Sequence, residues 1–259
     1  MQKQQTVVFK VGTSTLTHEN GKTNIRRLEE LVMTLSDLAN AGIRVVLVTS
    51  GAIGVGVGKL GLPERPRDTA GKQAAATVGQ CELMFIYDKM FAEYGKTVGQ
   101  LLITKQDFTD PERHGNLSNA FERLFAYGAI PIVNENDAVA VEEIVYGDND
   151  TLSAEVAVLT QADKLIILTE TDGLYDANPQ TCPSAHLITE VTKVTAAIRS
   201  CAGDAISGVG TGGMATKVHA AEIALAKGID TYIINGAQPQ AVYALLDGKP
   251  VGTHFKAVK

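Results

Sequence analysis

The architecture of this chain follows from its first apolar segment, Thr6-Val-Val-Phe-Lys-Val11, which leads directly into the turn Gly12-Thr-Ser-Thr15. Lys10 is the one charged residue in this run of β-forming residues, a pattern typical of a buried parallel strand. Residues 24–41 follow with leucines at helical spacing, and residues 43–48 form a second apolar run that ends in another glycine turn. A strand, a helix and a strand within about fifty residues predict a βαβ unit and a parallel sheet.

The rest of the chain alternates in the same way, so its 259 residues predict one large α/β domain or two α/β lobes. Further helices are predicted at residues 69–94, 116–127, 151 onward, 192–201 and 214–227, and further strands at residues 97–104, 129–133, 164–169, 229–234 and, as the sheet edge, 251–255.

The turns after Val11 and Val48 are expected to lie near each other, because parallel strands end at the same edge of their sheet. Both turns offer backbone N–H groups and hydroxyls, and both can lead into helix N-termini. This combination suits anionic oxygens, phosphate above all. Either turn taken alone is equally well explained as an ordinary glycine turn of an α/β protein.

A further polar segment, Val145-Tyr-Gly-Asp-Asn-Asp-Thr-Leu-Ser-Ala-Glu-Val-Ala157, places Asp148, Asn149 and Asp150 on a tight turn before a predicted helix. Asp150 is a good N-cap for a helix that opens at Thr151. A capped helix after a surface turn would explain this turn if it stood alone.

Its setting indicates more than a helix cap. The turn follows Asn134-Glu-Asn-Asp137, a polar cluster at the end of another predicted strand. A calcium-binding EF-hand loop is nearly excluded, because Leu152 and Ser153 stand where it needs an oxygen ligand and a glycine. A site rich in amides and carboxylates indicates a substrate that carries both an ammonium and a carboxylate group.

The segment Gly208-Val-Gly-Thr-Gly-Gly213 enters a predicted helix with Lys217 in its first turn. The helix dipole disfavours a cation there by roughly 0.3 to 1 kcal/mol, so a phosphate between Lys217 and the loop amides explains the lysine better than solvent exposure does. Two segments match GxGxxG, this one and Gly56-Val-Gly-Lys-Leu-Gly61, but neither starts at a strand end as a dinucleotide fold requires. A Walker A motif is also missing.

Composition excludes several classes of protein. The net charge of −6 and the sequence pI of about 5.4 give no basic footprint for nucleic acid. Met1 to Gln5 lead straight into a strand and no apolar run approaches a membrane span, so neither a signal peptide nor membrane insertion is expected. Three scattered cysteines without a CxxC pair favour a reducing, cytoplasmic location.

Five segments in this order resemble the glutamate 5-kinase group of the amino acid kinase family, and the resemblance runs from about residue 6 to residue 255. They are Phe9-Lys-Val-Gly-Thr-Ser14, Val48-Thr-Ser-Gly-Ala-Ile53, Val133-Asn-Glu-Asn-Asp-Ala138, Gly147-Asp-Asn-Asp-Thr-Leu-Ser153 and Gly210-Thr-Gly-Gly-Met-Ala-Thr-Lys217.

The resemblance implies a fold and a domain organisation. The expected fold is a three-layer αβα sandwich with a mainly parallel central sheet, formed by a single kinase domain over residues 1–259. A glutamate and phosphoryl-acceptor lobe at about residues 1–160 and a nucleotide lobe at about residues 161–259 are implied. Many bacterial members carry a further C-terminal PUA domain, and this chain is expected to be a form that lacks it.

The implied activity is transfer of the ATP γ-phosphoryl group to the side-chain carboxylate of L-glutamate, which gives L-glutamyl 5-phosphate and starts proline synthesis. Phosphoryl transfer between two anions needs positive charge around the moving group. By similarity Lys10 and Lys217 flank that group, and Asp150 holds both lysines. Magnesium is expected to arrive with ATP, held by its phosphates, with no protein ligand assigned.

The remaining implied site residues fall into two groups. The glutamate-binding positions are Ser50, Asp137 and Asn149, with Asn134 and Asp148 shaping the pocket; Asp137 is expected at the ammonium and Asn149 at the α-carboxylate. The ATP-binding positions are Lys10, Gly12, Gly51, Thr169, Glu170, Thr211, Gly212, Gly213, Met214, Ala215, Thr216 and Lys217. Glu170 is the weaker match, because the family often has aspartate or another polar residue there.

Other functions stay open at this point. The same fold hosts kinases for acetylglutamate, aspartate, carbamate and uridylate, although the GDND and NENDA segments favour free glutamate. An amino acid or nucleotide sensor is the alternative outside enzymes, and it would need neither lysine. Expected partners are ATP and L-glutamate, further copies of the chain in a dimer or tetramer, and transiently glutamyl phosphate reductase, with neither nucleic acid nor membrane.

Overall fold

The computed structural model describes residues 4–16, 23–139, 149–203 and 213–258. Its strands are β1 (Thr6–Val11), β2 (Arg44–Val48), β3 (Val98–Ile103), β4 (Ile130–Glu135), β5 (Lys164–Thr169), β6 (Glu190–Val191), β7 (Asp230–Asn235) and β8 (Thr253–Phe255). Its helices are α1 (Thr13–Leu16), α2 (Ile25–Asn40), α3 (Ala52–Leu60), α4 (Thr69–Glu93), α5 (Lys105–Thr109), α6 (Pro111–Ala126), α7 (Asn149–Leu159), α8 (Ala196–Cys201), α9 (Met214–Leu225) and α10 (Ala241–Leu246).

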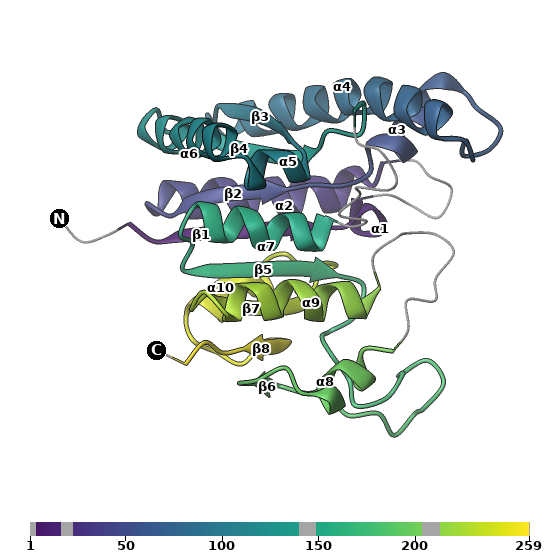
Figure 1. The fold of residues 1–259 in the computed structure, drawn as a ribbon. Helices are drawn as coiled ribbons and strands as arrows, with labels where there is room; N and C mark the ends of the chain where they lie inside the picture. Colours follow the sequence, from purple (N-terminus) through teal and green to yellow (C-terminus); the bar gives the residue numbers. More distant parts are fainter. Residues whose placement is uncertain (1–3, 17–22, 140–148, 204–212, 259) are drawn as a thin grey trace.

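The strands form one eight-stranded sheet in the order β3-β4-β2-β1-β5-β7-β8-β6 (Figure 1). All described pairs of neighbouring strands are parallel except β7 and β8. The first strand lies in the middle, and Lys10 stands in register with Val48 on one side and Ile167 on the other. The carboxyl ends of β1, β2 and β5 therefore meet at one edge of the sheet, as the sequence predicts.

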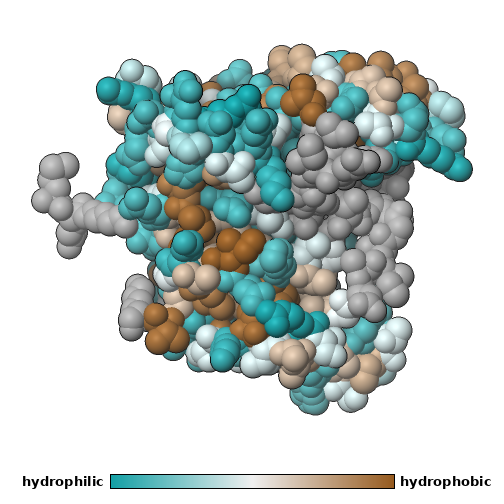
Figure 2. Space-filling model, in the orientation of Figure 1, coloured by the Kyte–Doolittle hydropathy of each residue, from teal (hydrophilic) through white to brown (hydrophobic). Residues whose placement is uncertain are grey.

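Helices cover both faces of the sheet, which confirms the predicted α/β layering. Alternate residues of β1 face opposite cores: Val7, Phe9 and Val11 pack with α2, α4 and α10, whereas Val8 packs with α6, α7 and α9. Lys10 has the same strand parity as Val8, so it lies on the side of α7 and α9. These two helices run side by side over the sheet (Figure 1). Figure 2 shows this side of the molecule, where apolar surface gathers around the middle and hydrophilic residues dominate above it.

The predicted bounds of β1 and β5 are correct to the residue, and other boundaries differ for identifiable reasons. Helix α6 begins at Pro111 instead of residue 116, because Asp110 caps it by accepting hydrogen bonds from two backbone N–H groups. Helix α8 begins at Ala196 instead of residue 192, because Thr195 caps it and the strand β6 precedes it.

Two further predictions were wrong in detail. The strand predicted as the sheet edge, β8, lies between β7 and β6, so the two-residue β6 is the edge on that side. Helix α7 begins at Asn149, so Asp150 lies in its first turn instead of at its N-cap. Helix α10 was not predicted.

Candidate active site

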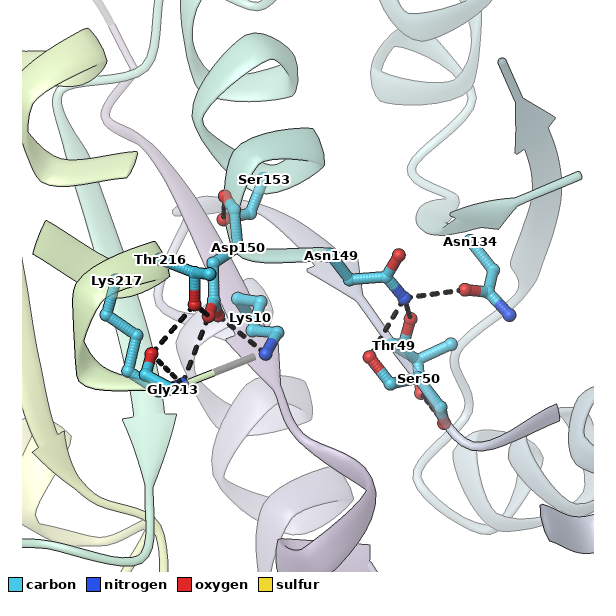
Figure 3. Close-up of polar contacts among 10 residues, drawn as sticks. All are labelled: Lys10, Thr49, Ser50, Asn134, Asn149, Asp150, Ser153, Gly213, Thr216 and Lys217. Carbon is cyan, nitrogen blue, oxygen red and sulfur yellow. Dashed lines mark hydrogen bonds and ion pairs between the residues drawn. The ribbon is translucent and has the colours of Figure 1, made fainter. Parts of the chain in front are cut away.

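The centre of the candidate site is Asp150, whose side chain is fully buried beside two lysines from distant parts of the chain (Figure 3). The Lys10 Nζ lies 2.6 Å from Asp150 Oδ1, and the Lys217 Nζ lies 3.0 Å from Asp150 Oδ2. Side-chain exposure is 7% for Lys10 and 8% for Lys217, so water does little to screen either ion pair.

Three secondary-structure elements place these side chains. Lys10 is the penultimate residue of β1, Asp150 lies in the first turn of α7, and Lys217 lies in the first turn of α9. The hydroxyl of Thr216 lies 2.8 Å from Asp150 Oδ2 and 2.7 Å from the Gly213 carbonyl oxygen, so it can donate to either acceptor. The start of α9 is thereby tied to α7.

Opposing influences act on the charge of Asp150. Burial raises the pKa of this carboxyl, but the charges of Lys10 and Lys217 and hydrogen bonds from Lys10 and Thr216 outweigh burial, so its pKa lies below the ordinary value. Asp150 is therefore ionised at neutral pH. Two ammonium groups and one carboxylate leave one positive charge in excess, which suits an anionic ligand such as a phosphate.

A cluster of amides adjoins the lysines, because Asn149 directly precedes Asp150 (Figure 3). The Asn149 Nδ2 lies 2.6 Å from the Thr49 carbonyl oxygen, 2.8 Å from Ser50 Oγ and 2.8 Å from Asn134 Oδ1. Three acceptors thus surround a nitrogen that carries two hydrogens. The carboxyl ends of β2 and β4 meet the start of α7 at this point.

Asp137 follows β4 and is half-buried, and no hydrogen bond joins it to the amide cluster among the described residues. Burial raises the pKa of the Asp137 carboxyl, and the positive charge of Arg65 offsets this only in part. Asp137 thus lies two residues beyond the end of β4, in which Asn134 is the last residue but one.

The positions assigned to phosphate and nucleotide occupy several strand ends and helix starts. Gly51 is the N-cap of α3 with φ of 102°, and Thr13 packs against it, so the turns after β1 and β2 are in contact. Gly12 directly follows β1, Gly213 is the N-cap of α9, and Met214, Ala215 and Thr216 lie in the first turn of that helix. Thr169 and the exposed Glu170 lie at the end of β5. Asp148, Thr211 and Gly212 lie outside the described residues.

The sequence assigned no function to two residues of α4 that contact this region. Gln80 accepts a hydrogen bond from Asn134 Nδ2 at 2.8 Å, and the Tyr87 hydroxyl lies 2.8 Å from Thr49 Oγ1. Burial raises the pKa of Tyr87, with a smaller opposing effect from Thr49. The one available signal for Gln80 was its place among the small and apolar residues that α4 buries.

A metal site made by the protein alone is not found among the described residues, since no three His, Cys, Asp or Glu side chains come together there. Both oxygens of Asp150 are already paired with lysines. Within the described residues, no helix combines the length and the apolar character needed to cross a membrane.

Solved structures share this fold. A carbamate kinase from Giardia lamblia superposes with a TM-score of 0.69 and 18% identity, and it covers all of both chains. An isopentenyl phosphate kinase from T. acidophilum superposes with a TM-score of 0.67 and 17% identity, over 97% of this chain and all of the other. At this level of identity the likeness concerns the fold alone.

Sequence comparison gives closer relatives. Residues 5–235 match the model of the amino acid kinase family. A glutamate 5-kinase of Clostridium tetani is 53% identical over 253 residues, which cover 98% of this chain and 95% of the relative. A glutamate 5-kinase of Listeria welshimeri is 51% identical over 96% of this chain and 92% of its own length, and one of Moorella thermoacetica is 53% identical over 96% of this chain and 66% of its own. This chain belongs to the amino acid kinase family.

Proposed function

We propose that this protein transfers the γ-phosphoryl group of ATP to the side-chain carboxylate of L-glutamate, forming L-glutamyl 5-phosphate for proline synthesis. The observation that carries the proposal is the pair of buried lysines on Asp150, directly beside the amide cluster around Asn149. A site for a transferred phosphoryl group and a site for an amino acid acceptor are then neighbours. The relatives from Clostridium tetani and Listeria welshimeri described above are named glutamate 5-kinases.

The amino acid side of the site uses neutral and acidic groups. Asn149, Ser50 and Asn134 offer donors and acceptors suited to the α-carboxylate, and Asp137 meets the ammonium. Asp148, which is assigned to this pocket from the sequence resemblance alone, is the remaining member of the set. When the substrate binds, Asn149 Nδ2 gives up some of its hydrogen bonds to the three surrounding acceptors and donates to the substrate instead.

The chemistry needs no general base. The side-chain carboxylate of glutamate has an ordinary pKa of about 4.3 and is ionised at neutral pH, so its oxygen attacks the γ-phosphorus directly. The bond from that phosphorus to the β–γ bridging oxygen breaks, ADP leaves with the electron pair, and no proton is transferred. Lys10 and Lys217 stabilise the charge on the transferred oxygens, and Asp150 keeps both ammonium groups in place.

The nucleotide is held from the other side of the lysines. Backbone N–H groups of Gly12 and Gly51 bind phosphate oxygens, and the segment from Thr211 through Gly212 to Lys217, with Thr169 and Glu170, holds the rest of ATP. The N-terminus of α9 favours the negative charge of the phosphates. Magnesium would arrive with ATP, held mainly by the phosphates, and would neutralise part of their charge.

The cellular setting is also part of the proposal. We place the reaction in the cytoplasm, in a homo-oligomer of this chain that hands the labile acyl phosphate to its reductase through a transient contact. Size measurement in solution with and without substrates tests the assembly, and co-purification tests the contact with the reductase.

The test is ADP release with magnesium and ATP in the presence of hydroxylamine, which traps an acyl phosphate as a hydroxamate. L-Glutamate is compared with N-acetylglutamate, with aspartate and with no acceptor. Hydroxamate with L-glutamate alone is the expected result. If glutamate and ATP raise the melting temperature while no acceptor is turned over, the protein is a sensor and the proposal is wrong.

A further inference from the structure

Helix α4 approaches the amino acid side of the site closely enough to contribute side chains to it. At two points its backbone touches that of α3: a Cβ atom on Gly79 would lie 1.7 Å from the Ala52 carbonyl oxygen, and one on Gly56 would lie 1.8 Å from the Ala75 carbonyl oxygen. Because these glycines have no side chain, α4 is held against the first turn of α3. The next residue of α4 after Gly79 is Gln80, of which 8% is exposed.

Gln80 is connected to the substrate-binding amides through Asn134, of which 2% is exposed. Asn134 Oδ1 accepts from the Glu135 backbone N–H at 2.9 Å and from Asn149 Nδ2 at 2.8 Å. Its Nδ2 donates to Gln80 Oε1 at 2.8 Å. The chain of contacts runs from α4 through β4 to the first residue of α7.

These contacts fix which way the Asn134 amide points. The direction of the Glu135 N–H is set by the backbone, so an acceptor must face it, and Asn134 Oδ1 is that acceptor. The amide nitrogen must then face Gln80, which offers an oxygen. If the amide turned over, Asn134 Nδ2 would face two donors, the Glu135 N–H and Asn149 Nδ2, and Asn149 would lose one of its three acceptors.

The Gln80 amide nitrogen indicates that this residue does more than stabilise the fold. Its Nε2 is buried and has no hydrogen-bond partner among the described residues. A buried donor without a partner destabilises a folded protein, and an apolar side chain of the same length would avoid that cost. The acceptor that Gln80 supplies to Asn134 accounts for a glutamine at this position.

We infer that Gln80 is a positioning residue of the amino acid site, which orients the Asn134 amide and, through it, Asn149 for substrate binding. The inference rests on the proposed function, because it concerns the affinity for L-glutamate. It predicts an effect on the amino acid and none on the nucleotide, whose lysines are held separately by Asp150.

The primary variant is Gln80→Met, which keeps the length of the side chain and removes the acceptor. The KM for L-glutamate should rise about tenfold, the equivalent of one lost hydrogen bond, while the KM for ATP stays within about twofold. Thr160→Val is the matched control, because it removes a buried hydrogen bond, from the Thr160 hydroxyl to the Val156 carbonyl, that is not connected to Asn134 or Asn149. Its KM for L-glutamate should stay within about twofold of the parent.

A double-mutant cycle separates action through Asn134 from a general loss of structure. In the Asn134→Ala background, Gln80→Met should change the KM for L-glutamate by less than about twofold, because the intermediary is already gone. Effects of the two substitutions that multiply would overturn the inference, as would a Gln80→Met variant that binds L-glutamate like the parent.

A second variant covers the case in which Gln80→Met does not fold. Gln80→Glu keeps an oxygen towards Asn134, and burial favours its neutral, amide-like form at lower pH. At about pH 6 its KM for L-glutamate should lie within about threefold of the parent's at that pH, and a larger increase would contradict the acceptor role.

A parent protein that forms no hydroxamate from L-glutamate would refute the proposed function itself, and this outcome is separate from any effect at Gln80.

Discussion

Asp150→Asn is the substitution that tests the lysine pair most directly, because it removes one charge and almost no volume. The two Nζ atoms lie 2.6 and 3.0 Å from the carboxylate oxygens, and no side chain of the three is more than 8% exposed. With an effective dielectric constant of about 20, each contact supplies a gross attraction of about 6 kcal/mol, most of which offsets the cost of burying the charges.

The net effect follows from what remains after the substitution. Two buried ammonium groups are left side by side with no carboxylate between them, and breaking a buried ion pair in this way typically costs about 3 to 5 kcal/mol. We therefore expect the free energy of unfolding at neutral pH to fall by about this amount, measured by urea denaturation. Turnover should fall by about 100 to 1000-fold, because both lysines lose their fixed positions.

The loss of stability should depend on pH in a defined direction. The pKa of Asp150 is lower in the folded protein than in the unfolded chain, so its contribution is complete above the unfolded value of about 4 and disappears as the pH falls through the folded value. The difference between the parent and Asp150→Asn should thus be constant at higher pH and shrink below about pH 4.

The control is Asp88→Asn, the same chemical change at an exposed position on α4. It should leave both the free energy of unfolding and turnover close to the parent values. The role of Asp150 in holding the lysines would be refuted if the free energy of unfolding of Asp150→Asn lay within about 1 kcal/mol of the parent value. Turnover within about threefold of the parent would refute it as well.

Three further results are expected. Lys10→Ala and Lys217→Ala should each reduce turnover by about 100 to 1000-fold, and values within a few-fold of the parent would rule out the two-lysine mechanism. Asp137→Ala should raise the KM for L-glutamate far more than the KM for ATP. Because the pKa of Asp137 is raised, the KM of the parent for L-glutamate should fall as rising pH ionises this carboxyl, and the variant should not show this trend. Gly56→Ala should lower the free energy of unfolding by about 1 to 3 kcal/mol, because its Cβ would meet the Ala75 carbonyl. Gly58→Ala on the same helix, where a Cβ meets nothing within 4 Å, should raise the free energy of unfolding by about 0.5 to 1 kcal/mol. The reverse order in urea denaturation would contradict this packing.

The fold was predictable where burial alone determines the element. Strands β1 and β5 are buried on both faces, so their apolar runs begin and end where the strands do. Short elements such as β6 and α10 are held by neighbours distant in the sequence, and they leave no periodic pattern to read.

The same distinction applies to the site. Lys10 and Lys217 could be identified as candidate site residues from the sequence, because a lysine is unusual in a buried strand and in the first turn of a helix. Gln80 gave a far weaker signal, because a glutamine in a long helix that also carries Gln73 and several charged residues normally indicates a solvent-exposed position. Its role depends on the approach of α4 to α3 at Gly79, which is a tertiary contact that local sequence does not reveal.

The central position of β1 has a consequence for the making of this protein. Its partner on one side, β5, begins at Lys164, so at about 5 to 20 residues per second the ribosome completes it roughly 10 to 30 seconds after β1. During that interval the apolar strand that carries Lys10 has an unpaired edge, the kind of template on which chains aggregate. The nascent chain is thus most vulnerable to aggregation before the proposed ATP-binding residues from Thr169 to Lys217 are synthesised, and a chaperone that covers this edge should raise the yield of active enzyme.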